Sequence, residues 1–294
     1  MPNIGMFGFR ALWSPYFFLF IVAVMVLYFY AATKKRSWFS GSEPLKKKEG
    51  IFFVSALMLI YILKGSPIDL LSHLMFTFHM IQMAFLLLLA PQFLIIGIPV
   101  WMWEKILSLP VIRPIFRLLT KPILALILFN GTFSFYHVPA IFDTVKSDPF
   151  LHAVYTTMLF IFALGLWWPI YHKLGEEKPL QGLLRFGYLL AASALLTPAC
   201  ALIIFNGQPM YATYASAELW VKSLALCVPV DVLGNLNLSN PQLFNPLSLL
   251  YDQQLGGIIM KILQEFINGG VLYKIFIEWY RQENNNPDPI LPGQ

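Results

Sequence analysis

The run PYFFLFIVAVMVLYFYAA, residues 15–32, decides the fold class, because it holds eighteen successive residues without a charge. A helix needs about 20 apolar residues to cross the hydrocarbon core of a bilayer. Six Lys and Arg residues follow the run, within residues 34–48. A cleaved secretory signal carries its positive charges before a shorter apolar core. The run therefore predicts a retained transmembrane helix.

The composition extends this prediction to the whole chain. Of its 294 residues, 58% are hydrophobic and 12% are charged, whereas a soluble domain carries about 25% charged residues. The apolar runs predict an all-α bundle of about seven transmembrane helices, which forms a single membrane domain over residues 1–278 and contacts the lipid bilayer. The predicted spans are residues 15–32, 49–65, 73–96, 122–138, 150–170, 186–205 and 254–277.

Lysine and arginine are distributed unevenly over the connections between these spans. The connections at 33–50, 97–121 and 171–185 hold thirteen of them. The alternate connections, counted with Lys64 at a span boundary, hold four. Basic residues favour the cytoplasmic side of a membrane. The N-terminus is therefore predicted to lie outside, and the C-terminus in the cytoplasm.

Two segments beyond the spans are predicted from their residue types. Residues 206–253 form the longest loop and mix turn residues with apolar ones. This mixture predicts a loop that folds against the outer end of the bundle. Residues 279–294 are polar and rich in proline, which predicts a disordered cytoplasmic tail.

The segment HLMFTFHMIQM, residues 73–83, is unusual in a membrane span, because it holds two histidines, three methionines and a glutamine. Helical spacing predicts that Met75, His79 and Met83 share one face, with Gln82 beside them. Thioether and imidazole groups together suit Cu(I), which is a soft ion. The segment therefore predicts a copper-binding face.

Three further histidines are predicted near the same depth. His73 starts the third span on its outer side, His137 ends the fourth there, and His152 starts the fifth there. Histidines on two facing helices also suit haem iron. A metal-free interpretation stays open as well, since methionine fills gaps in apolar cores and histidine hydrogen-bonds between membrane helices.

The segment YDQQLGGIIMKILQEFINGG, residues 251–270, opens the seventh predicted span. Asp252, Gln253 and Gln254 mark its outer end, where an acidic residue complements the helix dipole. Its two Gly-Gly pairs permit close contact between helices. Lys261 and Glu265 fall near the middle of the membrane, four residues apart. They predict either an internal ion pair that fixes packing or a polar path or docking surface.

Five motifs occur in order along nearly the whole chain: RALWSPYFF (10–18), HMIQM (79–83), YHVPAIFD (136–143), FLHAVYTTMLFIFALGLWWPI (150–170) and DQQLGGIIM (252–260). Together they resemble the CtaG family of bacterial membrane proteins, in its Bacillus-type branch. The resemblance implies a multi-pass protein of the bacterial plasma membrane. It also implies a role in assembling a caa-type haem–copper cytochrome c oxidase and in delivering copper to the copper site of oxidase subunit I.

The resemblance also selects site residues. The family pattern His-Met-x-Gln-His is similar to His79–Met83, with methionine here in place of the last histidine. This replacement removes an imidazole and favours Cu(I) over zinc or Cu(II). The remaining family patterns correspond to His137, His152 and the acidic-amide run 252–254.

The main hypothesis is a metallochaperone that holds Cu(I) with His79 and Met83, together with some of His73, His137, His152 and Met75. Its partners would be oxidase subunit I and other copper chaperones or assembly factors. Two alternatives remain, a metal-free scaffold that docks oxidase subunits and a haem-binding membrane cytochrome. The chain has no GxSxG, HExxH, P-loop or GxGxxG signature, so neither an enzyme nor a nucleic-acid-binding protein is predicted.

Overall fold

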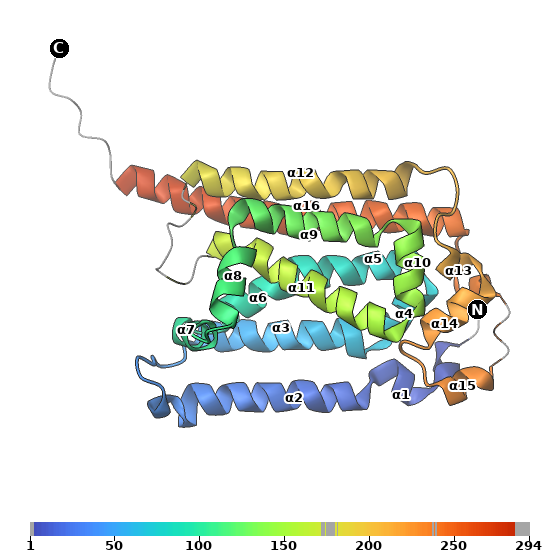
Figure 1. The fold of residues 1–294 in the computed structure, drawn as a ribbon, viewed down its shortest axis with the longest axis horizontal. Coiled ribbons are helices and arrows are strands. Elements are labelled where there is room, and N and C mark those ends of the chain that lie inside the picture. The colour runs from blue at the N-terminus through green and yellow to red at the C-terminus, as the bar shows by residue number, and fades with distance from the viewer. Residues whose placement is uncertain are drawn as a thin grey trace, which may run out of the picture.

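The computed structural model describes residues 3–171, 174, 180, 182–236, 238 and 240–285. Within them all regular structure is helical, as Figure 1 shows. The helices that shape the bundle are α1 (Gly8–Trp13), α2 (Pro15–Phe29), α3 (Lys47–Gly65), α4 (Pro67–Leu74), α5 (Phe76–Ala84), α6 (Ala90–Gly97), α7 (Val100–Leu107), α8 (Ile112–Leu119), α9 (Pro122–Tyr136), α10 (Pro139–Ser147), α11 (Pro149–Tyr171), α12 (Gly182–Phe205), α13 (Ala212–Ala215), α14 (Ala217–Leu224), α15 (Val230–Gly234) and α16 (Leu249–Asn285).

Five helical segments of the described chain are long and apolar enough to cross a membrane: Ile4–Lys34, Phe76–Gly97, Pro149–Tyr171, Gly182–Phe205 and Leu249–Asn284. Two bent pairs of helices, α3 with α4 and α9 with α10, raise this number to seven if each pair is one span. The predicted all-helical bundle is therefore confirmed, while its orientation in the membrane stays a prediction.

Prolines mark the two bends. Pro67 starts α4 after a bend of 47°, and Pro139 starts α10 after a bend of 80°. The residue before a proline is forced toward extended backbone, and Ser66 and Val138 both have that conformation. The Ser66 side chain also accepts a hydrogen bond from the Ile68 amide, which caps α4.

A third break, at Met75, corrects the predicted third span. Met75 has extended backbone, with φ −137° and ψ 133°, so His73 belongs to α4 and the span starts at Phe76. The break is stabilised by the Asp252 carboxylate, which comes from α16 and accepts hydrogen bonds from the first amides of α5. The spacing of apolar residues along the chain does not reveal such a long-range contact.

The described loops and helix ends differ from the predicted boundaries in two places. Residues 206–253 contain the short helices α13, α14 and α15, which lie together at one end of the bundle in Figure 1. Helix α16 continues to Asn285, so the first part of the predicted tail is helical. The rest of that tail, residues 286–294, lies outside the described residues.

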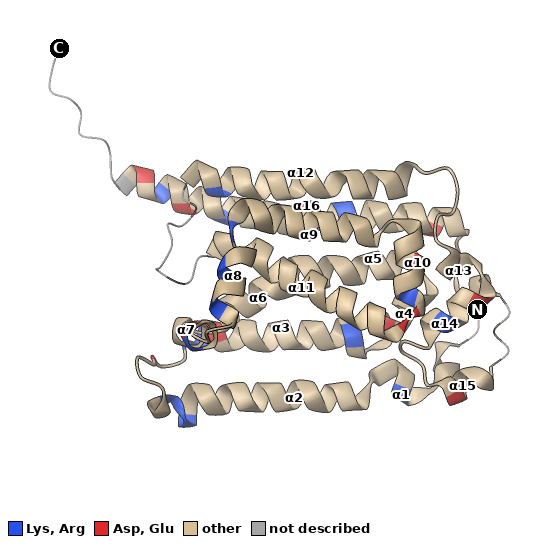
Figure 2. Ribbon diagram, viewed as in Figure 1, with Lys and Arg blue, Asp and Glu red and all other residues tan. Residues whose placement is uncertain are grey.

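The two ends of the bundle differ in charge. Figure 2 shows lysine and arginine at the end that carries α7 and α8, which we call the basic end. We call the opposite end, formed by α4, α10 and the start of α11, the histidine end. One large core of aromatic and aliphatic side chains runs through the bundle, and a second, smaller core lies under α14 and α15 at the histidine end.

Candidate functional site

His79 and His137 face each other at the histidine end, and we call them the inner pair. His79 lies in the first part of α5, and His137 directly follows the last residue of α9. Their ring centroids are 6.0 Å apart. Both side chains are buried, and neither ring nitrogen of His79 has a hydrogen-bond partner. An unsatisfied buried polar group is costly, so the inner pair has the character of a binding site.

The tautomer of His137 follows from its one hydrogen bond. Its Nδ1 lies 2.8 Å from the carbonyl oxygen of Phe133. Because a carbonyl oxygen only accepts, Nδ1 carries the proton and Nε2 has the free lone pair. This Nε2 is buried and has no partner. A hydrogen bond of this kind is what orients a metal-binding histidine in many proteins.

Aromatic rings close the space around His79. The rings of Phe76, Tyr136 and Phe142 have centroids 5.9, 5.8 and 5.2 Å from that of His79. The Tyr136 hydroxyl is also buried without a partner. The inner pair therefore lies among aromatic rings, and the side chains of His79, His137 and Tyr136 each keep a buried polar atom without a partner there.

Asp252 fixes the helix that carries His79. Its carboxylate accepts hydrogen bonds from the amides of Phe76, at 2.7 Å, and of Thr77, at 3.1 Å. The Thr77 hydroxyl donates in turn to the Asp252 carbonyl, at 3.0 Å. A carboxylate at a helix N-terminus satisfies open amides and complements the helix dipole. The last helix of the chain thereby sets the position of α5.

The two glutamines that follow Asp252 in sequence form hydrogen bonds in the same region. Gln253 accepts from the Met210 amide, at 2.7 Å, and donates to the Ile203 carbonyl, at 3.2 Å. Gln254 donates to the Asn206 carbonyl, at 3.3 Å. Both side chains thus tie α16 to the end of α12 and the loop that follows it.

His73 and His152 form a second pair, which we call the outer pair. Their ring centroids are also 6.0 Å apart. The His73 Nδ1 lies 3.0 Å from Ser223 Oγ and 3.3 Å from Lys146 Nζ. This nitrogen therefore already has two polar neighbours. Lys146 is fully buried and also donates to the Ser72 carbonyl, at 3.3 Å.

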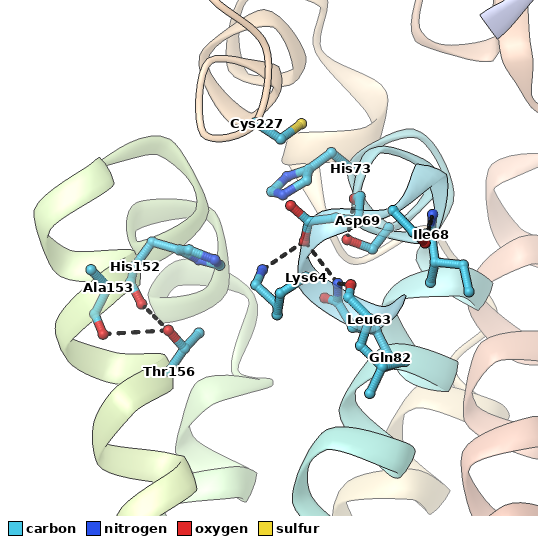
Figure 3. Close-up of polar contacts among 12 residues, drawn as sticks. Leu63, Lys64, Ile68, Asp69, His73, Gln82, His152, Ala153, Thr156 and Cys227 are labelled. Carbon is cyan, nitrogen blue, oxygen red and sulfur yellow. Dashed lines mark hydrogen bonds and ion pairs between the residues drawn. The ribbon is translucent and has the colours of Figure 1, made fainter. Parts of the chain in front are cut away.

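A polar network surrounds the outer pair, as Figure 3 shows. Asp69 pairs with Lys64 at 2.6 Å and accepts from Gln82 at 2.8 Å. Gln82 also donates to the carbonyl of Leu63, at 2.6 Å. Gln82 therefore links α5 to the bend between α3 and α4, as a member of a polar network. The carboxylate of Asp69 is committed to Lys64, and the buried amino group of Lys146 lies next to the outer pair.

Cys227 lies close to His73 in Figure 3. Its thiol donates to the Leu224 carbonyl, at 3.5 Å, and burial raises the pKa of the thiol well above its ordinary value. The thiolate is the form that binds metals, so the raised pKa disfavours metal binding by Cys227. Both cysteines of the chain are free thiols.

The structure separates the predicted copper ligands into smaller groups. Met83 is buried in the main core one turn after His79, whereas Met75 packs into the smaller core with Phe7 and Trp220. The expected single face with Met75 is thus interrupted by the break at that residue. No group of three or more His, Cys, Asp or Glu side chains in the described chain surrounds one ion position. A metal here would depend on two histidines and a softer ligand.

Lys261 and Glu265 form an ion pair on α16, with Nζ and Oε1 2.7 Å apart. Lys261 also donates to Thr197 on α12, at 2.9 Å, and to Gln264, at 3.3 Å. The lysine therefore faces the protein and links two helices. The glutamate side chain, in contrast, is 56% exposed.

The sequence profile of a protein family described as cytochrome c oxidase caa3 assembly factor matches residues 10–282. The chain belongs to this family. The resemblance seen in the motifs is thereby confirmed over nearly the whole chain. No match is found among curated proteins or among solved structures.

Two residues with polar contacts at the histidine end were missed by the sequence analysis. Lys146 was counted only as a basic residue of an outer connection, but its side chain is buried beside His73. Asp143 accepts from the amides of Ala212 and Thr213, at 3.1 and 2.9 Å, and so anchors α13 over the histidine end. Asp143 lies in the motif YHVPAIFD, which was the available signal.

Proposed function

We propose that this chain assists the assembly of a caa3-type cytochrome c oxidase by holding Cu(I) at the inner pair for transfer to oxidase subunit I. The family supplies the assembly role, since its description is a cytochrome c oxidase caa3 assembly factor. The observation that carries the copper role is the set of buried, unpartnered nitrogens on His79 and His137.

The inner pair fits the preferences of Cu(I). Histidine nitrogens bind a metal at about 2 Å, so two ligands of one ion lie at most about 4 Å apart. Ring centroids at 6.0 Å are compatible with that separation. Met83, one turn along α5 from His79, offers a thioether of the kind that soft Cu(I) accepts. In this proposal copper is the cargo of the protein.

The limited number of ligands suits transfer rather than storage. His137 Nε2 is preset by the Phe133 hydrogen bond, and His79 is preset by the Asp252 contacts at the start of α5. An ion held by these few groups keeps positions free for incoming ligands of a client protein. Stepwise replacement of His79 and His137 by client histidines would then release the copper.

The haem alternative is less compatible with the packing. A porphyrin ring between His79 and His137 would occupy the space next to both imidazoles. The rings of Phe76, Tyr136 and Phe142 already lie within 5.9 Å of the His79 ring, measured between centroids. These side chains belong to the packed core. Haem binding would require their displacement.

A metal-free scaffold is the second candidate, because no group of three or more His, Cys, Asp or Glu ligands occurs among the described residues. In that case the inner pair would serve packing, and assembly would depend on surfaces that bind oxidase subunits. The two candidates differ in one measurable property, namely Cu(I) affinity.

The test is anaerobic Cu(I) titration of the full chain in detergent, with wild type, His79→Ala, His137→Ala and His152→Ala compared. We expect roughly one Cu(I) per chain, lost in both inner-pair variants and retained in His152→Ala, because removing a ligand costs more than the roughly 10- to 100-fold typical of supporting residues. Absorbance spectra of the same samples test for haem. Equal and negligible binding in all four proteins would rule out the copper role and leave the scaffold.

A further inference from the structure

A cavity of about 460 Å³ lies at the basic end of the bundle, and we call it the basic-end cavity. It is formed by the end of α11, the start of α12 and the last part of α16, which meet at that end in Figure 1. Sites for small ligands commonly have volumes of about 300–1,000 Å³. Both histidine pairs lie at the opposite end, so the proposed copper site does not use this cavity.

The charges that line the basic-end cavity do not balance. Among the described residues, its charged lining side chains are Arg185, Lys274 and Glu278. Arg185 Nη1 lies 2.7 Å from Glu278 Oε2, which is a close ion pair. Lys274 Nζ lies 3.7 Å from Glu278 Oε1, which is too long for a hydrogen bond. Two cations therefore share one carboxylate, and the lining attracts an anion.

Arg185 keeps a donor for such an anion. Its side chain is only 19% exposed, and its Nε is buried without a hydrogen-bond partner in the described chain. Glu278 accepts from Nη1 only. A guanidinium presents five N–H donors in a planar fork that matches the oxygens of a phosphate. Because a buried donor without an acceptor is costly, a phosphate oxygen at this position would be favourable.

The ammonium of Lys274 is held beside the cavity. It lies over the ring of Tyr171, 5.4 Å from the centroid, and Tyr171 lines the same cavity. The Tyr171 hydroxyl donates in turn to the side-chain oxygen of Gln92 on α6, which fixes the ring. A cation over an aromatic face is attracted to it and keeps its N–H donors for other groups. Lys274 therefore supplies a second, positioned donor.

The depth of the basic-end cavity matches that of lipid headgroups. One apolar span ends at Tyr171 and the next begins at Gly182, and both residues line the cavity. Trp279 also lines it, and tryptophan is enriched where the hydrocarbon meets the headgroups. Leu183 and Leu184, which follow Gly182, are 74% and 71% exposed and offer apolar surface to acyl chains. Basic pockets between transmembrane helices are known to bind anionic headgroups.

We propose that the basic-end cavity binds the headgroup phosphate of an anionic phospholipid such as phosphatidylglycerol, with Arg185 and Lys274 as donors. The single charge of this headgroup balances the lining, whereas a zwitterionic headgroup does not. Its glycerol hydroxyls would donate to Glu278. The bound lipid would join the ends of α11, α12 and α16. This site depends neither on copper nor on an oxidase partner.

The experiment uses the full chain in detergent after removal of bound lipid. Native mass spectrometry measures the binding of phosphatidylglycerol and of phosphatidylcholine with the same acyl chains, for wild type, Lys274→Gln and Lys48→Gln. Lys48 is the matched control, because it is also an exposed lysine over an aromatic ring, 5.9 Å from the centroid of Phe52. We expect wild type and Lys48→Gln to prefer phosphatidylglycerol. Lys274→Gln should bind it about fivefold more weakly, the effect of one basic residue near anionic lipid.

Two further variants test the charge balance of the lining. Arg185→Gln should lower the affinity for phosphatidylglycerol at least as much as Lys274→Gln, and its unfolding temperature is measured in parallel because it also breaks the ion pair with Glu278. Glu278→Gln removes the negative charge and should raise the affinity. A purely structural ion pair would not produce this gain.

Three outcomes would overturn the proposal. The first is equal affinity of wild type for the two lipids, and the second is an equal loss in Lys274→Gln and Lys48→Gln, which would indicate general surface charge. The third concerns the source of the phosphate. Inorganic phosphate has the same acceptor oxygens but no acyl chains. If it raised the unfolding temperature of wild type as much as phosphatidylglycerol at equal concentration, the ligand would be a soluble anion and not a lipid.

Discussion

The inner and outer pairs have the same ring separation, 6.0 Å, but different neighbours. His79 and His137 are surrounded by aromatic rings and keep unpartnered nitrogens. His73 is held by Ser223 and by the buried ammonium of Lys146. An amino group at hydrogen-bond distance competes with a metal ion for that nitrogen, and it also repels a cation when it is protonated. Distance between two histidines is thus a weaker guide to metal binding than the groups that engage their nitrogens.

The largest expected effect comes from removing one histidine of each pair and comparing the Cu(I) affinities of the two variants. His79→Ala should lower Cu(I) affinity by at least about 100-fold, because it removes a ligand rather than a supporting residue. His73→Ala should change the affinity by less than about threefold, which corresponds to well under 1.4 kcal/mol. Competition with a Cu(I) chelator measures both values. Equal losses in the two variants would contradict the distinction between the pairs.

Asp252→Ala should affect the inner pair through the position of α5. The change leaves the buried amides of Phe76 and Thr77 without an acceptor, and an unmatched buried donor costs about 1–3 kcal/mol. We expect a lower thermal unfolding temperature in detergent and about 10- to 100-fold weaker Cu(I) binding. Asp252→Asn, which keeps an acceptor oxygen, should recover part of both losses. A variant that unfolds earlier but binds copper like wild type would show that the cap has no role in the site.

Lys146→Met should make the outer pair more similar to the inner pair. Removing the ammonium frees the lone pair of His73 and takes a positive charge away from His152. We expect the stoichiometry to rise from roughly one toward roughly two Cu(I) per chain, while stability changes little, since replacing a buried charge by an apolar side chain is often neutral. The control is Lys146→Arg, which keeps the charge. Unchanged stoichiometry in Lys146→Met would show that the charge is not what excludes copper from the outer pair.

The smallest effect is expected at Cys227. Because burial raises the pKa of its thiol, the thiolate is scarcer at pH 7 than in an unfolded chain, where the pKa of cysteine is about 8.5. Maleimide labelling of the native protein, on a Cys200→Ser background, should therefore be slow at pH 7 and faster as the pH rises. Since the folded pKa lies above the unfolded one, this thiol favours folding below about pH 8.5, and the contribution declines at higher pH. Cys227→Ser should leave Cu(I) affinity unchanged.

The apolar runs predicted the helical bundle well, because membrane helices are determined by the hydrophobicity of their own residues. The gathering of His79, His137 and His152 at one end followed from their positions along these runs. The break at Met75 could not be predicted, since it depends on Asp252, which lies 176 residues from Phe76 in sequence. The burial of Lys146 could not be predicted from the sequence either, because the residues around it belong to α4 and α14.

The same physical limit applies to the division of the histidines into an inner pair and an outer pair. Helical spacing placed Met75, His79 and Met83 on one face, which is valid only for an unbroken helix. The engagement of His73 by Ser223 joins residues 150 positions apart. Sequence patterns therefore predicted which residue types gather at the histidine end, while the choice between the two pairs required the contacts of each nitrogen.

The cap of α5 by Asp252 has a consequence for biosynthesis. Helix α5 is made early, but the carboxylate that secures its first turn belongs to α16, the last helix of the chain. A nascent chain that has inserted only its earlier spans lacks that carboxylate, and the turn that carries His79 toward His137 is not yet secured. If the inner pair holds Cu(I) as proposed, completion of the polypeptide and readiness to receive metal coincide, and truncated or stalled products would be unable to sequester copper in the membrane.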